Sequence, residues 1–239
     1  MKTIGLIGGM SWESTAHYYS ELNRGAKHRL GGRHSAKLLL YSIDFDELAT
    51  LQHADHWDDA IALMVDAGKR LERGGADCVL ICANTMHIAA PQLESRVRLP
   101  LLHVVDVTAN AIRKSGAKKK IGLLGTVFTM EMPFYKNRLS EKFGFDVIVP
   151  DTADRAESHR IIFDELVHGV VSPAAEESYR GIIGRLVAQG AEAIILGCTE
   201  LMMIIEPADS PVPLFDTTTL HCEAALDFAI GTSGAEARL

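Results

Sequence analysis

The feature that most constrains this chain is an internal repeat. Segment 2–8, Lys-Thr-Ile-Gly-Leu-Ile-Gly, is similar to segment 119–125, Lys-Lys-Ile-Gly-Leu-Leu-Gly, at an offset of 117 residues. Segment 75–85 is similar to segment 190–200 at an offset of 115, and segment 100–102 to segment 213–215 at an offset of 113. Matches in one order and at nearly constant offset indicate a duplication. We therefore predict two similar lobes of roughly 110 residues each.

The hydrophobic pattern predicts the class of each lobe. Short apolar runs rich in Val, Ile and Leu alternate with segments of helical periodicity, of which 58–71 and 179–187 are the clearest. Apolar strands separated by amphipathic helices are typical of parallel sheets covered by helices on both faces, so the predicted fold class is α/β. The predicted strands are 3–7, 37–43, 77–82, 101–105, 120–124, 146–149, 193–197 and 213–215.

Composition narrows the range of partners and locations. Lys and Arg number 24 against 31 Asp and Glu, and no basic cluster stands out, which argues against a nucleic-acid partner. The longest apolar stretches, 78–83 and 193–198, are far too short to cross a bilayer. The N-terminal segment lacks the apolar core and cleavage site of a signal peptide. We expect a cytoplasmic protein that does not bind membranes.

The four cysteines are expected to be free thiols. Cys78 and Cys82 lie four residues apart in one predicted strand, where their Cα atoms would be about 13 Å apart, too far for a disulfide. Free thiols are typical of cytoplasmic proteins. We expect Cys78 and Cys222 to be packing residues.

The repeated strand ends are the places where chemistry is expected, because ligands of parallel α/β sheets bind beyond the carboxyl ends of the strands. The first turn is Ala83-Asn84-Thr85 and the second is Cys198-Thr199-Glu200. Each precedes a predicted helix, so backbone N–H groups at 84–85 and 199–200 are expected to bind a carboxylate or phosphate. A thiol at such a helix N-terminus is stabilised as thiolate, so the pKa of Cys198 is expected to fall below about 8.5.

Three segments together resemble the cofactor-independent aspartate/glutamate racemase family. They are Gly5-Leu6-Ile7-Gly8-Gly9-Met10-Ser11-Trp12-Glu13-Ser14-Thr15, Cys82-Ala83-Asn84-Thr85-Met86-His87 and Leu196-Gly197-Cys198-Thr199-Glu200. Phe215-Asp216-Thr217-Thr218 is similar to that family too, and within it the branch of broad-specificity or L-aspartate/glutamate racemases of bacteria is the nearest.

The resemblance implies proton exchange at the α-carbon of a free amino acid without pyridoxal phosphate or another cofactor. Two acid/base groups, usually thiols, would face each other across the substrate in a site between the lobes. Inversion fits two catalysts on opposite walls, because the planar carbanion must be reprotonated from the far side. Cys198 would be one of them, and the N–H groups of Asn84, Thr85, Thr199 and Glu200 would hold the substrate carboxylate.

The family resemblance also implies a domain arrangement and an assembly. The strand and helix at about 215–230 would return to complete the first lobe. We therefore predict a first lobe of residues 1–105 plus 215–232, a second lobe of residues 106–214, and a homodimer.

This chain departs from the family pattern at the first turn. The family's first cysteine directly precedes Asn-Thr, and that position is Ala83 here; the repeat gives the same result, since 198 minus 115 is 83. Alanine has no proton to exchange. Cys82 lies one residue earlier, and in a strand that step turns a side chain to the other face, so packing is its expected role. A water molecule, Thr85 or a displaced Cys82 is left as the second group.

Other residues carry weaker signals. Ser11 is expected to cap the helix that follows Gly8-Gly9-Met10, and Met10, Ser11 and Gln52 are candidates for substrate contact; from sequence alone Gln52 is a loop residue. The segment does not match Gly-x-Gly-x-x-Gly, which weakens a dinucleotide interpretation. His53 and His56 have no third ligand nearby, so no metal site is predicted. His87 is expected to be a structural hydrogen-bonding residue.

Arg155 and Arg160 are candidates to bind a substrate side-chain carboxylate, although exposed helical arginines are the commoner case. The resulting hypothesis is an amino-acid racemase, an isomerase acting through Cys198. The alternatives are a single-cysteine lyase or isomerase of the same superfamily, a non-catalytic amino-acid-binding homologue and, more remotely, a nucleotide-binding protein.

Overall fold

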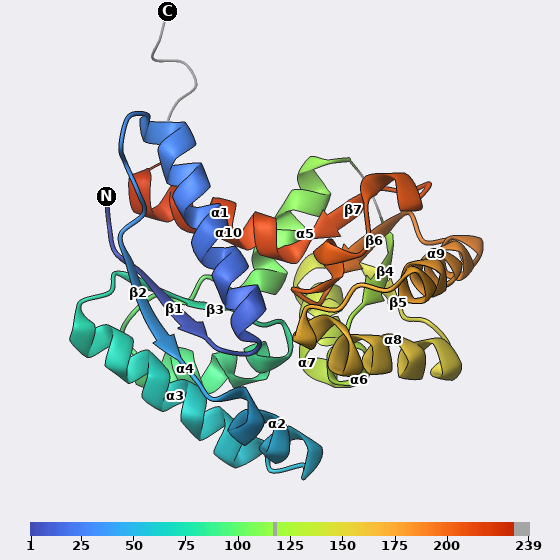
Figure 1. Cartoon of the computed structure of the whole chain (residues 1–239), viewed down its shortest axis with the longest axis horizontal. Helices are drawn as coiled ribbons and strands as arrows, with labels where there is room; N and C mark the ends of the chain where they lie inside the picture. Colours follow the sequence, from blue (N-terminus) through green and yellow to red (C-terminus); the bar gives the residue numbers. More distant parts are fainter. Residues whose placement is uncertain (117–118, 232–239) are drawn as a thin grey trace, which may run out of the picture. The chain divides into compact units, whose positions relative to one another are not determined.

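The computed structural model describes residues 1–116 and 119–231. The chain divides into two compact units. The first unit comprises Met1–Cys82, Ala89–His103 and the segment from His221, and the second comprises Ala83–Ile88 and Val104–Leu220. Each unit contains a parallel sheet flanked by helices (Figure 1), which confirms the predicted α/β class.

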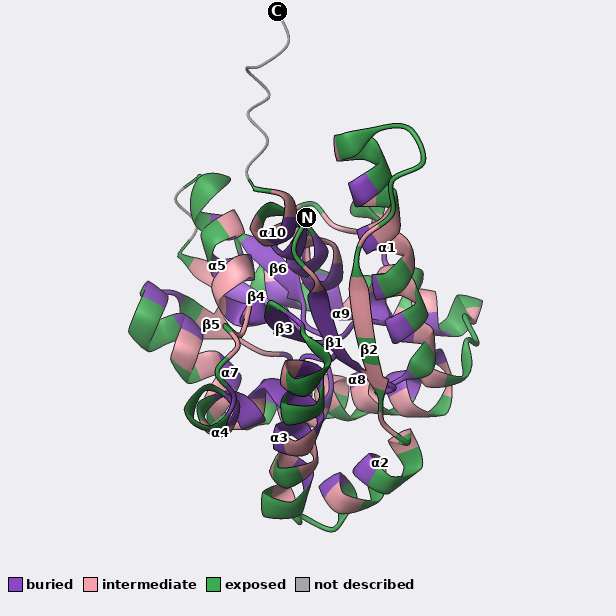
Figure 2. Cartoon of the chain, turned by 90° about the vertical axis from the view of Figure 1, so that its left-hand side faces the viewer, coloured by how far each residue is buried: buried purple, intermediate pink, exposed green. Residues whose placement is uncertain are grey.

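The first unit is built on three parallel strands in the order β2-β1-β3. Its elements are β1 (Ile4–Gly8), α1 (Trp12–Leu30), β2 (Leu38–Ser42), α2 (Phe45–His53), α3 (Trp57–Gly74), β3 (Cys78–Ile81), α4 (Ala90–Arg96) and most of α10 (Thr217–Ile230). Side chains of α1 and α10, among them Tyr18, Leu22 and Leu226, pack with the strand residues Leu6 and Leu80. Strands β1 and β3 are fully buried, whereas the edge strand β2 is only partly covered (Figure 2).

The second unit is built on four parallel strands in the order β5-β4-β6-β7. Its strands are β4 (Lys120–Leu124), β5 (Asp146–Ile148), β6 (Ala193–Leu196) and β7 (Leu214–Asp216). Its helices are α5 (Val104–Lys114), α6 (Val127–Glu131), α7 (Pro133–Asn137), α8 (Thr152–Asp164) and α9 (Pro173–Ala188), with a π-helical turn η2 (Arg138–Lys142) and short 3-10 turns η3 (Leu166–His168), η4 (Leu201–Met203) and η5 (Pro207–Asp209).

Strand β6 shows why this sheet is covered on both faces. Its alternate residues Ala193 and Ile195 pack in a cluster with α5 and α7, while Ile194 and Leu196 pack in a cluster with α8 and α9. Successive side chains of a strand point to opposite faces, so a strand buried on both sides has an unbroken apolar sequence. The unbroken apolar run Ala-Ile-Ile-Leu therefore correctly predicted a strand that is buried on both faces.

The pairing register reproduces the sequence repeat. In the first sheet Ile4 pairs with Cys78, and in the second Ile121 pairs with Ala193. These pairs are related by the offsets found in the sequence, since 121 minus 4 is 117 and 193 minus 78 is 115. The internal duplication is therefore confirmed at the level of individual strand residues.

The predicted strand over residues 101–105 is wrong in extent. Only Leu101 joins the first sheet, through one parallel bridge to Val79, and α5 begins at Val104. Leu101 occupies the place that Leu214 of β7 holds beside Ile194 in the second sheet. Over five residues, the start of a buried helix and a short buried strand are equally apolar. The hydrophobic pattern therefore could not distinguish a helix from a strand at 101–105.

The unit boundaries differ from the predicted ones in three places, of which the smallest is that Val104 and Val105 belong to the second unit. Residues 83–88 belong to the second unit, where the side chain of Asn84 bonds to Tyr135 and Thr217. Strand β7 pairs with β6 of the second sheet, so the chain returns to the first unit only from His221. Residue 232, the last of the predicted first lobe, lies outside the described residues.

One interaction fastens the returning helix α10 to the first unit. The buried His221 accepts a hydrogen bond from the Tyr18 hydroxyl at 3.0 Å and donates one to the Leu102 carbonyl at 2.6 Å. Burial lowers the pKa of His221 to about 4, so the imidazole is neutral at pH 7.

None of the described helices is both long and apolar enough to cross a membrane.

Candidate active site

The candidate residues of the second unit follow β3 and β6, whose ends are equivalent in the two repeats. The N–H of Cys82 donates to the end of β1 over 2.9 Å, and the N–H of Gly197 donates to the end of β4 over 2.7 Å. Because 197 minus 82 is 115, the two hydrogen bonds are equivalent in the internal repeat. Ala83 therefore occupies the position that Cys198 occupies in the second turn, and both are 9% exposed.

Cys82 is a core residue of the first unit. Its side chain is fully buried in the cluster that includes Tyr18 and Leu22, and burial raises the pKa of its thiol. Its repeat equivalent Gly197 cannot carry a side chain, because a Cβ there would come within 2.6 Å of the Leu124 carbonyl oxygen. The structure thus agrees with the packing role expected for Cys82.

Cys78 and Cys222 lie in the same cluster as Cys82, with exposures of 0% and 2%. Burial raises the pKa of Cys78 to about 11. All four cysteines are free and buried, and Cys198 is the most exposed of them.

Cys198 lies beside a buried carboxylate. Its thiol donates a hydrogen bond to Glu200 Oε2 at 3.0 Å, and the Thr199 hydroxyl donates to the same oxygen at 2.8 Å. Thr199 and Glu200 are 4% and 3% exposed. The sequence predicted a role only for the backbone N–H of Glu200, not for its carboxylate. The short Cys-Thr-Glu spacing could have predicted the contact, because side chains two residues apart in a turn can reach each other.

The expectation of a lowered pKa for Cys198 is wrong. The helical turn that follows it, η4, has three residues, and so short a turn has little dipole. Burial raises the pKa of the Cys198 thiol well above its ordinary value, and the charge and hydrogen bond of Glu200 raise it further. Hydrogen bonds from the N–H groups of Glu200 and Thr199 lower it only in part. In this structure sulfur carries its proton.

Asn84 uses its whole side-chain amide inside the second unit. Its Nδ2 donates to Thr217 Oγ1 at 3.0 Å, and its Oδ1 accepts from the Tyr135 hydroxyl at 3.0 Å. Thr217 in turn donates to the Leu196 carbonyl, at the end of β6. The side chain of Asn84 therefore anchors the first turn to the rest of the second unit.

Thr85 belongs to a cluster of three buried hydroxyl groups. Its Oγ1 lies 3.1 Å from Thr126 Oγ1 and 3.0 Å from Thr129 Oγ1. Thr126 also caps α6 by accepting a hydrogen bond from the Thr129 N–H. The sequence analysis missed both partners, although a Thr-x-x-Thr directly after β4 is the usual pattern of a capping residue.

His87 is a structural residue, as expected. Its Nε2 accepts from the N–H of Val104 at 3.2 Å, which leaves Nδ1 to donate to the Ala83 carbonyl at 2.8 Å. Both ring nitrogens of the neutral imidazole are therefore engaged. His87 fixes the carbonyl of the residue that replaces the first cysteine of the family.

Met10, Ser11 and Gln52 belong to the first unit and are buried. Ser11 caps α1 by accepting the N–H of Ser14 at 3.3 Å, as its place after the glycines predicted. Gln52 lies in α2 and not in a loop, because the segment around it has its own cap at Asp44.

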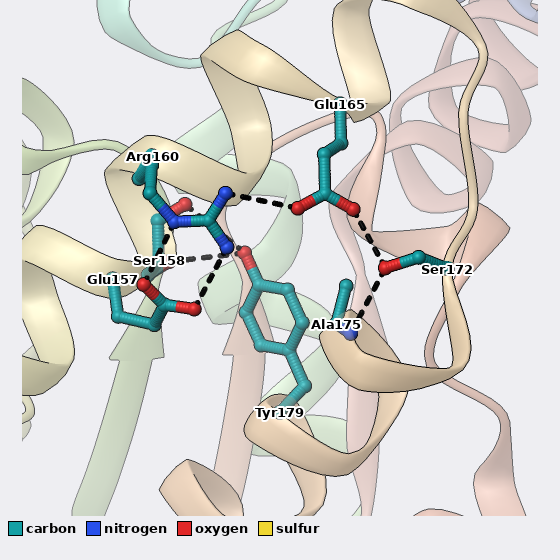
Figure 3. Close-up of polar contacts among 7 residues, drawn as sticks. All are labelled: Glu157, Ser158, Arg160, Glu165, Ser172, Ala175 and Tyr179. Carbon is teal, nitrogen blue, oxygen red and sulfur yellow. Dashed lines mark hydrogen bonds and ion pairs between the residues drawn. The ribbon is translucent and has the colours of Figure 1, made fainter.

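Arg160 is bound within the surface of the second unit. Its guanidinium lies between Glu157 and Glu165, with N–O distances of 2.9 and 3.0 Å (Figure 3). Glu165 also accepts from Ser172, whose hydroxyl caps α9 at the N–H of Ala175. The network fastens α8 to the start of α9, which accounts for Arg160 without a substrate.

The remaining polar candidates are also engaged locally. Arg155 donates to Glu131 at 2.7 Å and to the Pro150 carbonyl at 2.6 Å. His53 bonds through Nδ1 to the Ala49 carbonyl of its own helix. Neither contact points to a substrate or a metal.

A family model described as Asp/Glu/Hydantoin racemase matches residues 7–225, which include both turns. The chain belongs to this family. The match covers most of both repeats and the first residues of the segment that returns to the first unit. Membership identifies the protein as an isomerase of the amino-acid racemase class.

Individual relatives agree with this assignment. A putative Asp/Glu racemase of Yersinia pestis is 48% identical, with 96% of this chain and 100% of that chain covered and a TM-score of 0.89. PH1733, an aspartate racemase homologue of Pyrococcus horikoshii, is 35% identical over 96% of this chain and 100% of its own, with a TM-score of 0.82. The broad specificity amino-acid racemase RacX of Bacillus subtilis is 25% identical over 224 residues, or 90% of this chain and 92% of RacX.

Proposed function

We propose that the protein is a cofactor-independent racemase that exchanges the α-proton of a free acidic amino acid through Cys198. The observation that carries this proposal is the contrast among the four thiols. Cys78, Cys82 and Cys222 pack in the apolar cluster of the first unit, whereas the thiol of Cys198 donates to the carboxylate of Glu200. Cys198 also follows β6 at the edge where parallel sheets bind ligands. The relatives of Yersinia pestis and Pyrococcus horikoshii are a putative Asp/Glu racemase and an aspartate racemase homologue, which supports an acidic substrate.

Backbone and side chains divide the substrate contacts in this proposal. The N–H groups of Asn84, Thr85 and Thr199 bind the α-carboxylate, and they also stabilise the charge that develops when the α-proton leaves. The side chain of Asn84 is already bonded to Tyr135 and Thr217, so it holds its own N–H in place for this role. Met10, Ser11 and Gln52 remain further candidates for substrate contact in this proposal.

The second proton-transfer group is the open part of the proposal. Ala83 has no proton to exchange, and Cys82 is fully buried among apolar side chains. A water molecule or the hydroxyl of Thr85 is then left. Thr85 is bonded to Thr126 and Thr129, a chain of hydroxyl groups along which a proton can pass.

Ala83 also supports a second candidate function. A single thiol is sufficient to protonate an enolate on one face, as in a lyase or isomerase of the same superfamily that removes a group other than the α-proton. Stereochemistry separates the two functions, because two catalysts invert the α-carbon and one catalyst retains its configuration.

The test is α-proton exchange in D2O, followed by NMR with L- and D-aspartate and L- and D-glutamate as separate substrates. We expect loss of the α-proton signal with formation of the opposite antipode, in protein pretreated with hydroxylamine to remove any pyridoxal phosphate. Exchange with retention would identify the one-thiol enzyme. Binding without exchange of any of the four compounds would refute the racemase and favour the one-thiol lyase or an amino-acid-binding homologue.

We also propose that the protein is a homodimer. The exposed Trp12 and Tyr19, with 68% and 58% exposure, lie seven residues apart on one face of α1 and supply apolar surface for such a contact. Sedimentation equilibrium across a concentration series would test this, and a monomer at all concentrations would contradict it.

A further inference from the structure

The closest partner of the Cys198 thiol is a carboxylate that the proposed function does not use. Glu200 Oε2 accepts hydrogen bonds from the sulfur at 3.0 Å and from the Thr199 hydroxyl at 2.8 Å. Both hydrogen bonds end on one oxygen of the carboxyl group, which is the acceptor in each. Because Glu200 is 3% exposed, little water screens its charge from the sulfur.

The internal repeat indicates that this carboxylate belongs with the thiol. The position equivalent to Glu200 is Thr85, since 200 minus 115 is 85, and the position equivalent to Cys198 is Ala83. The first turn thus lacks both the sulfur and the acid, while the second turn has both. Thr85 uses its hydroxyl to bond Thr126 and Thr129. The backbone turn therefore does not need a carboxylate at this position.

We infer that Glu200 is a positioning residue that keeps the proton on the Cys198 sulfur until a substrate carbanion takes it. The inference rests on the proposed function for that last step. There the S–H bond breaks, the electron pair of the carbanion forms the new C–H bond, and the sulfur is left as thiolate. In the reverse direction the thiolate takes the α-proton, and the thiol returns to Glu200.

Two other titratable groups of the second unit, Tyr179 and Glu157, do not supply this charge. Tyr179 on α9 packs in the same cluster as Cys198, but burial raises the pKa of its phenol and the ring stays neutral. Glu157 on α8 is paired with Arg160 at the surface, where solvent screens it. Glu200 is therefore the charge in direct contact with the sulfur.

The test follows the alkylation of Cys198 by iodoacetamide as a function of pH, with mass spectrometry to identify the modified cysteine. Only the thiolate reacts, so the midpoint reports the proton on sulfur. In Glu200→Gln the charge is lost and the size is kept. We expect the midpoint to move to lower pH by about one unit or more, which raises the rate below the midpoint about tenfold or more. An unchanged or higher midpoint would overturn the inference.

Two control variants keep this result specific. Glu177→Gln removes a surface carboxylate whose side chain is 80% exposed, and it should leave the midpoint of Cys198 unchanged. Glu200→Asp keeps the charge, so it should preserve a midpoint closer to the wild type than Glu200→Gln. If Glu200→Gln does not fold, a downward shift in Glu200→Asp as large as one unit would itself contradict the role of the charge.

Alkylation needs no substrate, so this test and the test of the proposed function fail separately. A shifted alkylation midpoint without α-proton exchange would support the role of Glu200 and refute the racemase. Amino-acid exchange with an unshifted midpoint would support the racemase and refute the role of Glu200. In an active enzyme we expect Glu200→Gln to shift the pH profile of exchange in the same direction as the alkylation midpoint.

Discussion

The turns after β3 and β6 have equivalent backbones and opposite side-chain roles. At the second turn the thiol of Cys198 and the hydroxyl of Thr199 both donate to the carboxylate of Glu200. At the first turn the side chain of Ala83 has no polar atom, and Asn84 and Thr85 direct their side chains to partners inside the second unit. The position of the turn in the sheet is therefore the same in both repeats, while the side chains differ. The second turn carries a thiol bonded to a carboxylate, and the first turn bonds to Tyr135 and Thr217 through Asn84.

The largest effect should come from replacing Cys198, with Cys82 beside the first turn as the control. Cys198→Ser keeps the shape of the turn but replaces the thiol with a far weaker acid, so we expect α-proton exchange to fall by about a hundredfold or more. The matched variant Cys82→Ala alters a fully buried thiol of the first unit and should retain activity, with some loss of stability. Exchange rates in D2O measure both. If Cys198→Ser retained full activity, the second turn would not be the reactive one.

The anchoring role of the first turn can be broken at Asn84. Asn84→Ala leaves the buried hydroxyl of Tyr135 without its acceptor, so we expect a loss of about 2 kcal/mol in the free energy of unfolding. Tyr135→Phe removes the same hydrogen bond from the other side. Denaturant titrations of the two single variants and the double variant should show that the double costs less than the sum. Strict additivity would indicate that the two residues do not depend on each other.

Restoring a thiol to the first turn sharpens the comparison. Ala83 is 9% exposed, as Cys198 is, so Ala83→Cys places sulfur in the equivalent position. We expect racemisation to accelerate by about tenfold or more, because a second acid/base group then acts on the α-carbon. The ratio of inversion to exchange, measured by chiral chromatography alongside NMR, is the decisive quantity. A lower or unchanged rate would count against facing bases.

The smallest effect should come from the hydroxyl cluster. Thr85→Val keeps the side-chain shape and removes a hydrogen bond to Thr126 and Thr129, which still bond to each other at 3.3 Å. We expect a loss of about 1 kcal/mol in stability. If Thr85 is the second proton-transfer group, exchange will fall far more than stability does. An equal activity in Thr85→Val and the wild type would assign that role to water.

Much of the fold could be predicted because it depends on local patterns. The strands at 120–124 and 193–197 are continuous apolar runs, and burial on both sheet faces requires such runs. The repeat offsets then predicted which strand residues pair. The failures lie where two structures share a pattern: the run at 101–105 is one bridge residue and a helix start, and Gln52 lies in a helix although its surroundings are polar.

The sequence by itself determined the two parallel sheets, their equivalent registers and the identity of the one turn that carries a thiol. These follow from residue spacing, which repeats whenever the backbone repeats. Only the tertiary structure decided how each polar side chain is used. The protonation of Cys198 depends on burial and on a carboxylate 3.0 Å away, and the anchoring of Asn84 depends on Tyr135, which is 51 residues distant in the chain. Distances and dielectric surroundings arise only when the chain is packed, which is why the expected thiolate proved to be a thiol.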